Sequence, residues 1–204
     1  NKLEHGPLIV ARLQAGETCA LVSDAGMPAI SDPGETLVAA CAQAGIPVYV
    51  VPGPTAALSA LVLSGLPTGR FTFEGFLSVN KRGRKEHLEA VRGETRTMIF
   101  YEAPHKLRKT LSDFSKVFGP DRKIALCREL TKLHEEVWRT TVGEAAAHYR
   151  EQEPRGEFVL VVAGGEAPAA PQQGYTLEEA AALARELAAA GLSSSEAARQ
   201  AAQE

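Results

Sequence analysis

Four side chains that can accept a proton stand near the ends of apolar runs in this sequence: Asp24, Glu102, His105 and Glu129. A carboxylate or an imidazole in such a position can act as a general base or accept a hydrogen bond from a reacting group. Each acid can equally be a loop cap or a member of an ion pair, and a single loop histidine is more often simply solvated. The residue types therefore identify candidates for a general base, and the sequence does not show which of them acts.

A glycine- and proline-rich loop surrounds the first of these acids. Residues 19–22 predict a short buried strand, residues 23–34 a loop, and residues 35–44 a helix. The small residues of the loop allow a ligand to approach the backbone, and Gly26 can adopt a positive φ without steric penalty. Open α/β sheets hold ligands in such loops, at the carboxyl ends of their strands. A purely structural role suits the second acid of this loop, Asp32, better than it suits the first.

A second loop of the same kind follows in the next unit of the chain. Residues 47–51 are mostly β-branched and predict a strand, and Thr55 is well placed to cap a helix over residues 56–64. In the loop between them, two prolines flank the permissive Gly53. Free amide donors at the start of that helix could bind a carboxylate or a ribose hydroxyl. Two such units predict neighbouring parallel strands whose loops meet at one edge of a sheet.

A basic run marks the best candidate for a domain boundary. Residues 70–77 alternate polar and aromatic side chains and predict a half-buried strand, and the polar residues 78–85 follow it. The cations of this run are Lys81, Arg82, Arg84 and Lys85. Most such runs are solvated linkers, but beside a cleft they can bind a phosphate backbone, and both explanations stay open. Weaker candidates for the same contact are Lys106, Arg108 and Lys109.

The rest of the chain alternates strands and helices. Apolar runs predict strands over residues 97–101, 123–127 and 158–163, and residues 136–141 are a candidate for a further strand. Helical patterns cover residues 2–14, 87–92, 106–118 and 142–151. Beyond a linker over residues 166–175, residues 176–190 predict a helix capped by Thr176, and a further helix begins within residues 192–196.

The composition indicates a globular protein of a reducing compartment. Hydrophobic residues make up 45% of the 204 residues, and no apolar run is long enough to span a membrane. Cys19, Cys41 and Cys127 lack the spacing of metal ligands and are interpreted as buried thiols of a cytosolic protein. A net charge of −3 argues against non-specific coating of nucleic acid without excluding a local basic patch.

Seven segments, in a fixed order, resemble one family. They read VSDAGMPAISDPG, PGPTAALSALVLSGLP, F-x-F-E-G-F-L, KRGRK, TMIFYEAPHKL, CRELTK and GEFVLVVAG. Together they resemble the bacterial small-subunit ribosomal RNA (cytidine-2′-O)-methyltransferases, which are members of the tetrapyrrole-methylase superfamily. The resemblance covers nearly all of residues 1–165 and continues weakly into the tail.

The resemblance implies two α/β domains of the tetrapyrrole-methylase type, with S-adenosyl-L-methionine bound in the cleft between them. The expected division is residues 1–77 for the remainder of an N-terminal α/β domain and residues 78–166 for a C-terminal α/β domain. Residues 167–204 would form a linker and a helical segment. The family begins with a further strand and a Pro-Ile-Gly-Asn type loop, so the N-terminal domain is expected to be truncated and to lack one wall of the cofactor site. A homodimer without metal or membrane contact is also implied.

The resemblance further implies methyl transfer to the 2′-hydroxyl of a cytidine ribose in the decoding region of small-subunit ribosomal RNA. Candidates for the catalytic acceptor of the hydroxyl proton are Asp24, Glu102 and Glu129. Residues that match segments bordering the cofactor are Ser23, Asp24, Ala25, Gly26, Ile30, Pro52, Gly53, Thr55, Ala56, Phe100, Tyr101, Glu102, Leu130 and Thr131. Residues expected to bind the RNA are Lys81, Arg82, Arg84 and Lys85.

Two other functions stay open. A methylase of small tetrapyrroles would share the fold and could use the basic run to bind the carboxylates of its substrate. A truncated, non-catalytic module would dimerise or dock on the ribosome without turnover.

Overall fold

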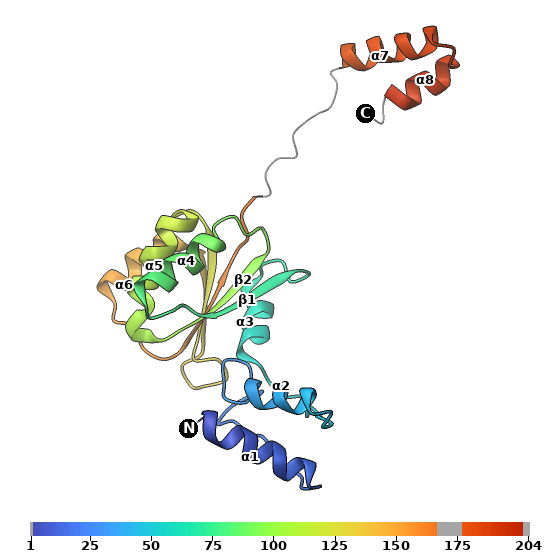
Figure 1. The fold of residues 1–204 in the computed structure, drawn as a ribbon. Helices are drawn as coiled ribbons and strands as arrows, with labels where there is room; N and C mark the ends of the chain where they lie inside the picture. The colour runs from blue at the N-terminus through green and yellow to red at the C-terminus, as the bar shows by residue number, and fades with distance from the viewer. Residues whose placement is uncertain (1, 167–176, 202–204) are drawn as a thin grey trace. The chain divides into compact units, whose positions relative to one another are not determined.

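A computed structural model describes residues 2–166 and 177–201, and the side chains of residues 6–166 and 178–201. The chain divides into two compact units between Gly165 and Glu166. Among the described residues, the first unit contains a five-stranded sheet with six helices and the second contains two helices (Figure 1).

Most elements form where the sequence predicts them. The helices of the first unit are α1 (Lys2–Gln14), α2 (Glu35–Gln43), α3 (Ala56–Ser64), α4 (Lys81–Ala90), α5 (Pro104–Phe118) and α6 (Val142–Glu151). Its strands are β1 (Phe71–Phe76), β2 (Thr97–Glu102), β3 (Lys123–Arg128), β4 (Glu136–Thr141) and β5 (Phe158–Val162). The second unit contains α7 (Leu177–Ala189) and α8 (Ser194–Ala201).

The strand directions bring several loops to one edge of the sheet. The strand order is β1-β2-β5-β3-β4, in which β1 and β2 are parallel and every other neighbouring pair is antiparallel. Because β5 runs opposite to both β2 and β3, its amino end lies beside their carboxyl ends. The residues that follow β1, β2 and β3 therefore meet the residues that precede β5, and we call this side of the sheet the loop edge.

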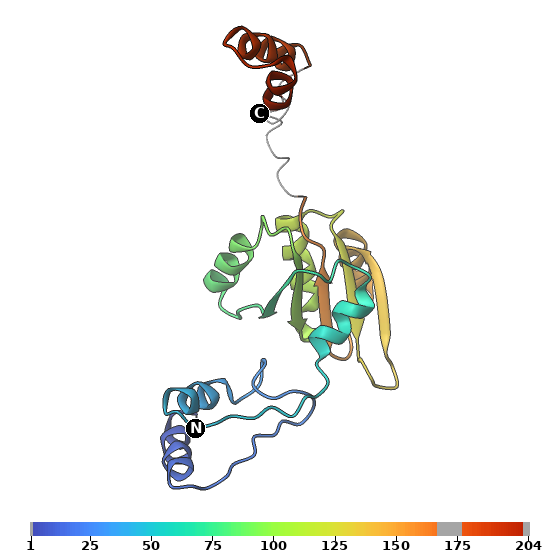
Figure 2. The ribbon, with the colours of Figure 1, turned by 90° about the vertical axis from the view of Figure 1, so that its right-hand side faces the viewer.

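Helices cover both faces of the sheet (Figures 1 and 2). One face packs against α4, α5 and α6 in a cluster that includes Phe100, Phe114 and Leu160. The other face packs against α3 in a smaller cluster that includes Ile99 and Val161. Successive side chains of a strand point to opposite faces, so Ile99 and Phe100 belong to different clusters.

Residues 19–22 and 47–51 do not form the buried parallel strands that the sequence predicts. Both segments are coil, and their side chains are largely exposed, with Val22 at 82% and Tyr49 at 90%. Figure 2 shows them in blue and cyan, connecting the helix pair α1–α2 to the rest of the unit. A β-branched run forms a strand only beside a partner that accepts its backbone hydrogen bonds, and no described strand lies beside either segment. For the same reason Cys19 is exposed instead of buried.

The basic run is helical and is not a linker. Asn80 caps α4 by accepting hydrogen bonds from the backbone amides of Arg82 and Gly83. The strand expected to close the N-terminal domain is β1, which pairs with β2 across the predicted boundary after Leu77. The sheet therefore includes residues from both sides of that boundary.

The second unit is a pair of packed helices. Ala197 and Ala201 of α8 are buried. The predicted helix over residues 176–190 forms as α7, while its predicted cap Thr176 and residues 167–175 of the predicted linker lie outside the described residues. No described helix is long and apolar enough to cross a membrane.

Candidate active site

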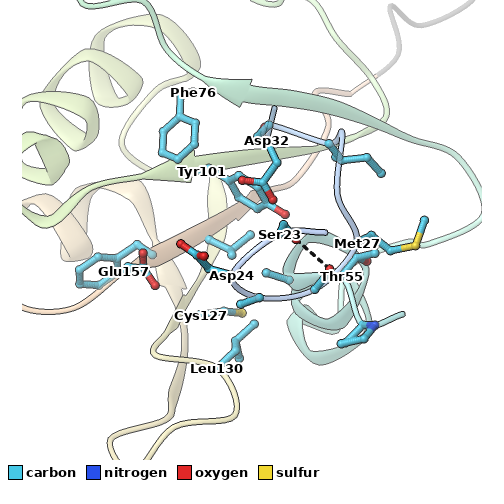
Figure 3. Close-up of a pocket in the computed structure, with 18 of the residues that line it drawn as sticks. Ser23, Asp24, Met27, Asp32, Thr55, Phe76, Tyr101, Cys127, Leu130 and Glu157 are labelled. Carbon is cyan, nitrogen blue, oxygen red and sulfur yellow. Dashed lines mark hydrogen bonds between the residues drawn. The ribbon is translucent and has the colours of Figure 1, made fainter. Parts of the chain in front are cut away.

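A cavity of about 720 Å³ opens at the loop edge of the sheet. One wall consists of residues 22–27, 30–33 and 54–56, and the opposite wall consists of residues that end β1 and β2, follow β3 and begin β5. Figure 3 shows labelled side chains from both walls around the same space.

The two glycine- and proline-rich loops are in direct backbone contact, as the sequence predicts. The amide of Met27 donates a hydrogen bond of 3.0 Å to the carbonyl of Pro54. Gly26 has a φ of +78°, and a Cβ at this position would lie 2.8 Å from the same carbonyl oxygen. Only glycine combines this conformation with this approach. The loops meet through this contact although the parallel strands expected to bring them together are absent from the described sheet.

Backbone strain is concentrated in the loops of the cavity. Ala29, Ser31, Glu129 and Thr131 adopt φ values of 69°, 58°, 50° and 64°, and they are the non-glycine residues with positive φ among the described residues. Such conformations are unfavourable for residues with a Cβ and persist where the surroundings impose them, often at functional sites. Both walls of the cavity contain such residues.

Most of the predicted cofactor and catalytic residues line this cavity. They are Ser23, Asp24, Ala25, Gly26, Ile30, Thr55, Ala56, Tyr101, Glu102, Glu129 and Leu130. Chain segments more than one hundred residues apart in the sequence therefore reach the same space.

Five predicted residues do not line the cavity: Pro52, Gly53, Phe100, Thr131 and the candidate base His105. Phe100 is fully buried against Phe114 on the α4–α6 face, because it alternates with Tyr101 along β2. Thr131 is exposed, and its amide donates to the Glu135 carboxylate.

Tyr101 closes the space between α3 and β1. Its hydroxyl accepts a hydrogen bond of 3.1 Å from the amide of Ala57, and the amide of Leu58 donates to the capping hydroxyl of Thr55. These two amides at the start of α3 are therefore occupied, and they are not the free donors that the sequence predicts. Burial, with a further contribution from the charge of Asp32, raises the pKa of Tyr101, so the phenol is neutral at physiological pH.

Glu102 belongs to a buried polar network. It is 3% exposed, its Oε1 accepts from the amide of Ala103, and its Oε2 accepts from the hydroxyl of Thr110 in α5. Thr110 in turn accepts a hydrogen bond of 2.7 Å from Arg84 of α4, and Arg84 forms a 2.7 Å ion pair with Asp113. Both carboxylate oxygens of Glu102 are occupied, so this residue fixes the turn between β2 and α5.

Arg84 is consequently a structural residue and not an RNA contact. Its side chain is 6% exposed and lies between α4 and α5, whereas Lys81, Arg82 and Lys85 are exposed. Arg84 lies four residues before the buried Leu88, so both residues belong to the face of α4 that packs on the core. Arg108 is also engaged, because it donates to the backbone carbonyl of Tyr149.

Glu129 joins the loop after β3 to the start of β5. Its amide donates to the carbonyl of Glu157, and its Oε1 accepts hydrogen bonds from the amide of Glu157 (2.9 Å) and from Lys132 (3.0 Å). These contacts, the backbone bond first, lower the pKa of Glu129. A carboxylate held in its charged form this way is a weak base. Glu129 therefore stabilises the cavity wall that the loop after β3 and the start of β5 form.

The carboxylates of Asp24 and Asp32 line the cavity and form no hydrogen bond or ion pair with other described side chains or backbone groups. Asp24 is exposed and Asp32 is half-buried. Figure 3 shows Asp24 at the centre of the cavity and Asp32 beside Tyr101. These two acids are free to contact a ligand.

Further lining residues were missed by the sequence analysis. They include Met27, Asp32, Phe76, Cys127, Lys132, Glu157 and Val159. The last residue of an alternating strand is a recognisable position, so the pattern of residues 70–77 could have identified Phe76. The residues at the start of β5 had no comparable signal, because only the antiparallel pairing places them at the loop edge. No cluster of three or more potential metal ligands occurs among the described residues.

Comparison with known proteins places the chain among methyltransferases. Residues 4–146 match the family of tetrapyrrole (corrin/porphyrin) methylases. The chain is 49% identical over 196 residues to ribosomal RNA small subunit methyltransferase I of Synechocystis sp., covering 96% of this chain and 70% of the relative. It is 44% identical over 201 residues to the protein of the same name from Escherichia coli O157:H7, covering 92% and 70%.

Solved structures show the same fold. Uroporphyrin-III C-methyltransferase from Thermus thermophilus matches with a TM-score of 0.53 and 24% identity, over 78% of this chain and 69% of that chain. A crystal structure of the T. thermophilus enzyme in complex with S-adenosylhomocysteine matches with a TM-score of 0.54 and 20% identity, over 80% and 74%. Cobalt precorrin-4 methyltransferase matches with a TM-score of 0.57 and 16% identity, over 80% and 71%. These likenesses confirm the predicted α/β fold of the tetrapyrrole-methylase type.

Proposed function

The chain belongs to the tetrapyrrole (corrin/porphyrin) methylase family. From its identity of 49% and 44% to two proteins named ribosomal RNA small subunit methyltransferase I, we propose that it is an S-adenosylmethionine-dependent methyltransferase of small-subunit ribosomal RNA. The acceptor in this proposal is the 2′-hydroxyl of a cytidine ribose. The observation that carries it is the cavity at the loop edge, formed by the segments that resemble the ribosomal RNA methyltransferases.

The cavity suits S-adenosylmethionine in size and chemistry. Its volume of about 720 Å³ lies in the range of small-molecule sites. Ile30, Tyr101 and Leu130 offer apolar surface for an adenosine, and the free carboxylates of Asp24 and Asp32 attract positive charge. The cofactor, when bound, supplies a methyl group on a positively charged sulfur.

The chain itself contributes orientation, exclusion of water and acceptance of a proton. The bond from Met27 to Pro54 holds the two loops together, which restricts where the reactants can lie. We assign to Asp24 the acceptance of the ribose hydroxyl proton, because its carboxylate faces the cavity without a partner among the described residues. Glu102 and Glu129 act as supports.

The exposed cations of α4 are the RNA contacts in this proposal. Lys81, Arg82 and Lys85 are exposed, and the helix begins shortly after β1 ends at the loop edge. Lys81 and Lys85 form no ion pair with other described residues, and Arg82 pairs only with the exposed Glu86. Exposed pairs of this kind are weak, so all three cations are available to phosphates.

We also propose that the protein is a cytoplasmic homodimer. Cys41 and Cys127 are free thiols, as expected in a reducing compartment. Tyr49 and Val51 expose 90% and 88% of their surface, and a second copy could bury such residues. Analytical ultracentrifugation measures the oligomeric state directly.

The deciding experiment is methyl transfer from radiolabelled S-adenosylmethionine to naked small-subunit RNA, to the assembled small subunit and to uroporphyrinogen III. We expect label in RNA, recovered as 2′-O-methylcytidine after digestion to nucleosides. Label in the tetrapyrrole alone would replace the proposal with the tetrapyrrole methylase. Absence of transfer, together with no binding of S-adenosylhomocysteine in calorimetry, would favour the non-catalytic docking module.

A further inference from the structure

An aromatic side chain is half exposed at the cavity. Phe76, the last residue of β1, lines the cavity and keeps 53% of its surface accessible. Figure 3 shows its ring above Tyr101 at the margin of the site. No contact proposed for the cofactor, the ribose hydroxyl or the RNA phosphates involves this ring.

A β-bulge orients Phe76 toward the cavity. Phe73 pairs with Ile99, but the register then shifts, so that Gly75 pairs with Phe100 and Phe76 with Tyr101. Phe73 and Phe76 are three residues apart, and a regular strand would place them on opposite faces. Gly75, with a φ of +61°, absorbs the extra residue. Without the bulge, the side chain of Phe76 would lie on the opposite face of the sheet, which α4, α5 and α6 cover.

The bulge creates an aromatic cluster on the cavity face. The ring centroids of Phe73 and Phe76 lie 5.1 Å and 5.5 Å from that of Tyr101, both in edge-to-face geometry. The hydroxyl of Tyr101 is held by the amide of Ala57, which fixes the ring that supports Phe76. Phe76 is therefore a positioned ring with a free surface.

A cationic segment follows Phe76 closely in the chain. Four residues separate Phe76 from Lys81, the first residue of α4, and Arg82 and Lys85 are also exposed there. Exposed aromatic rings beside cations are the combination with which proteins hold single-stranded nucleic acid, because bases stack on the ring while phosphates contact the cations.

We propose that Phe76 stacks on the nucleobase of the nucleotide to be methylated and thereby positions its ribose at the cavity. This inference rests on the proposed function and assigns to that site the residue that receives the base. The cofactor also contains a flat nucleobase, its adenine, which could stack on the same ring. The RNA base is the occupant we assign, because a ring with more than half of its surface accessible suits a ligand that arrives from outside.

The test compares Phe76→Ala, Phe76→Leu and Phe76→Trp with the parent protein and with Phe71→Ala. Phe71 is the matched control, because it is an exposed phenylalanine on the same strand that does not line the cavity. Methyl transfer to the assembled small subunit and equilibrium binding of S-adenosylhomocysteine are measured for each. We expect kcat/KM for the subunit to fall on the order of tenfold to a hundredfold for Ala and Leu. Trp should stay within about threefold of the parent, since it restores stacking.

A second readout does not depend on turnover. RNA carrying 5-iodocytidine at the methylated position should crosslink to Phe76 on irradiation, and the crosslink should disappear in Phe76→Ala but not in Phe71→Ala. Two results would overturn the inference: Phe76→Ala with parental kinetics and crosslinking, or a defect confined to S-adenosylhomocysteine affinity, which would assign the ring to the cofactor's adenine. A parent protein that neither methylates nor binds RNA would instead remove the proposed function and this inference with it.

Discussion

At the scale of single residues, three acids with the same position in the sequence pattern have three different environments. Glu102 has both oxygens occupied, Glu129 is held in its charged form by Glu157 and Lys132, and Asp24 is free of described partners. A group that must accept a proton in a reaction needs an accessible lone pair. Among these three acids, Asp24 meets this requirement best, because its carboxylate has no partner among the described residues.

Replacing Asp24 by Asn should therefore impair the chemical step. We expect kcat to fall on the order of a hundredfold, which is typical of the removal of a general base. Single-turnover methyl transfer measures the effect. Asp121→Asn, an exposed acid in the turn before β3, is the control and should leave kcat unchanged. A kcat within about twofold of the parent in Asp24→Asn would exclude this residue as the proton acceptor.

The three thiols should differ sharply in reactivity. Burial raises the pKa of Cys127 to about 11, Cys41 is buried, and Cys19 is exposed. Because the thiolate is the reactive form and Cys127 is neutral below its pKa, iodoacetamide at about pH 8 should modify Cys19 alone. Mass spectrometry of the folded protein reads out the modified site, and Cys19→Ser should abolish the reaction. Rapid modification of Cys127 under the same conditions would show that its environment is not the one described.

At the scale of elements, the site depends on contacts between segments that do not share a strand. The two loops of one wall are joined through Met27 and Pro54, and the opposite wall is held by the network from α4 through α5 to the end of β2. A substitution can therefore disrupt the contacts that hold one wall and leave the side chains of the opposite wall unchanged.

Gly26→Ala tests the first wall. The new Cβ would lie 2.8 Å from the carbonyl oxygen of Pro54 at a φ of +78°, so the loops must separate. We expect affinity for S-adenosylhomocysteine to fall by about tenfold, from a strain of about 1–2 kcal/mol. Gly93→Ala is the control, because no atom lies within 4 Å of its Cβ position and its φ is not positive. Equal affinities for the two variants in calorimetry would contradict the loop contact.

Thr110→Val tests the second wall. The substitution keeps the shape but removes the hydroxyl that links Arg84 to Glu102, which leaves a buried carboxylate oxygen without its donor. We expect the free energy of unfolding to fall by about 1–3 kcal/mol. Urea denaturation measures the change against Thr95→Val, in which the altered residue is exposed. Equal stability of the two variants would show that the network contributes nothing.

At the scale of the whole molecule, a chain of net charge −3 must bind a polyanion through a local surface. In our proposal the exposed cations of α4 form that surface. The cavity lies at the edge of the sheet where β1 ends, and α4 begins shortly after β1. RNA affinity should then depend on α4 while cofactor affinity does not.

Charge reversal at Arg82 and Lys85, both to Glu, should weaken binding to small-subunit RNA. The slope of log affinity against log salt should become shallower by about 1 for each phosphate that the variant no longer neutralises. Binding of S-adenosylhomocysteine should be unchanged. Filter binding over a salt series measures the slope, and reversal of the exposed Lys116 and Lys123 is the matched double control. An identical slope in both double variants would place the RNA elsewhere.

The sequence alone determined the family, most of the helices and strands, and the two loops that form one wall of the cavity. These features are local: hydrophobic periodicity, caps and turn residues act over a few positions, as in α3, whose bounds and Thr55 cap were predicted correctly. Only the tertiary structure decided that residues 47–51 stay unpaired, that Arg84 faces inward and that a bulge turns Phe76 toward the cavity. Strand pairing and burial depend on neighbours that are distant in the chain, and no local pattern contains that information.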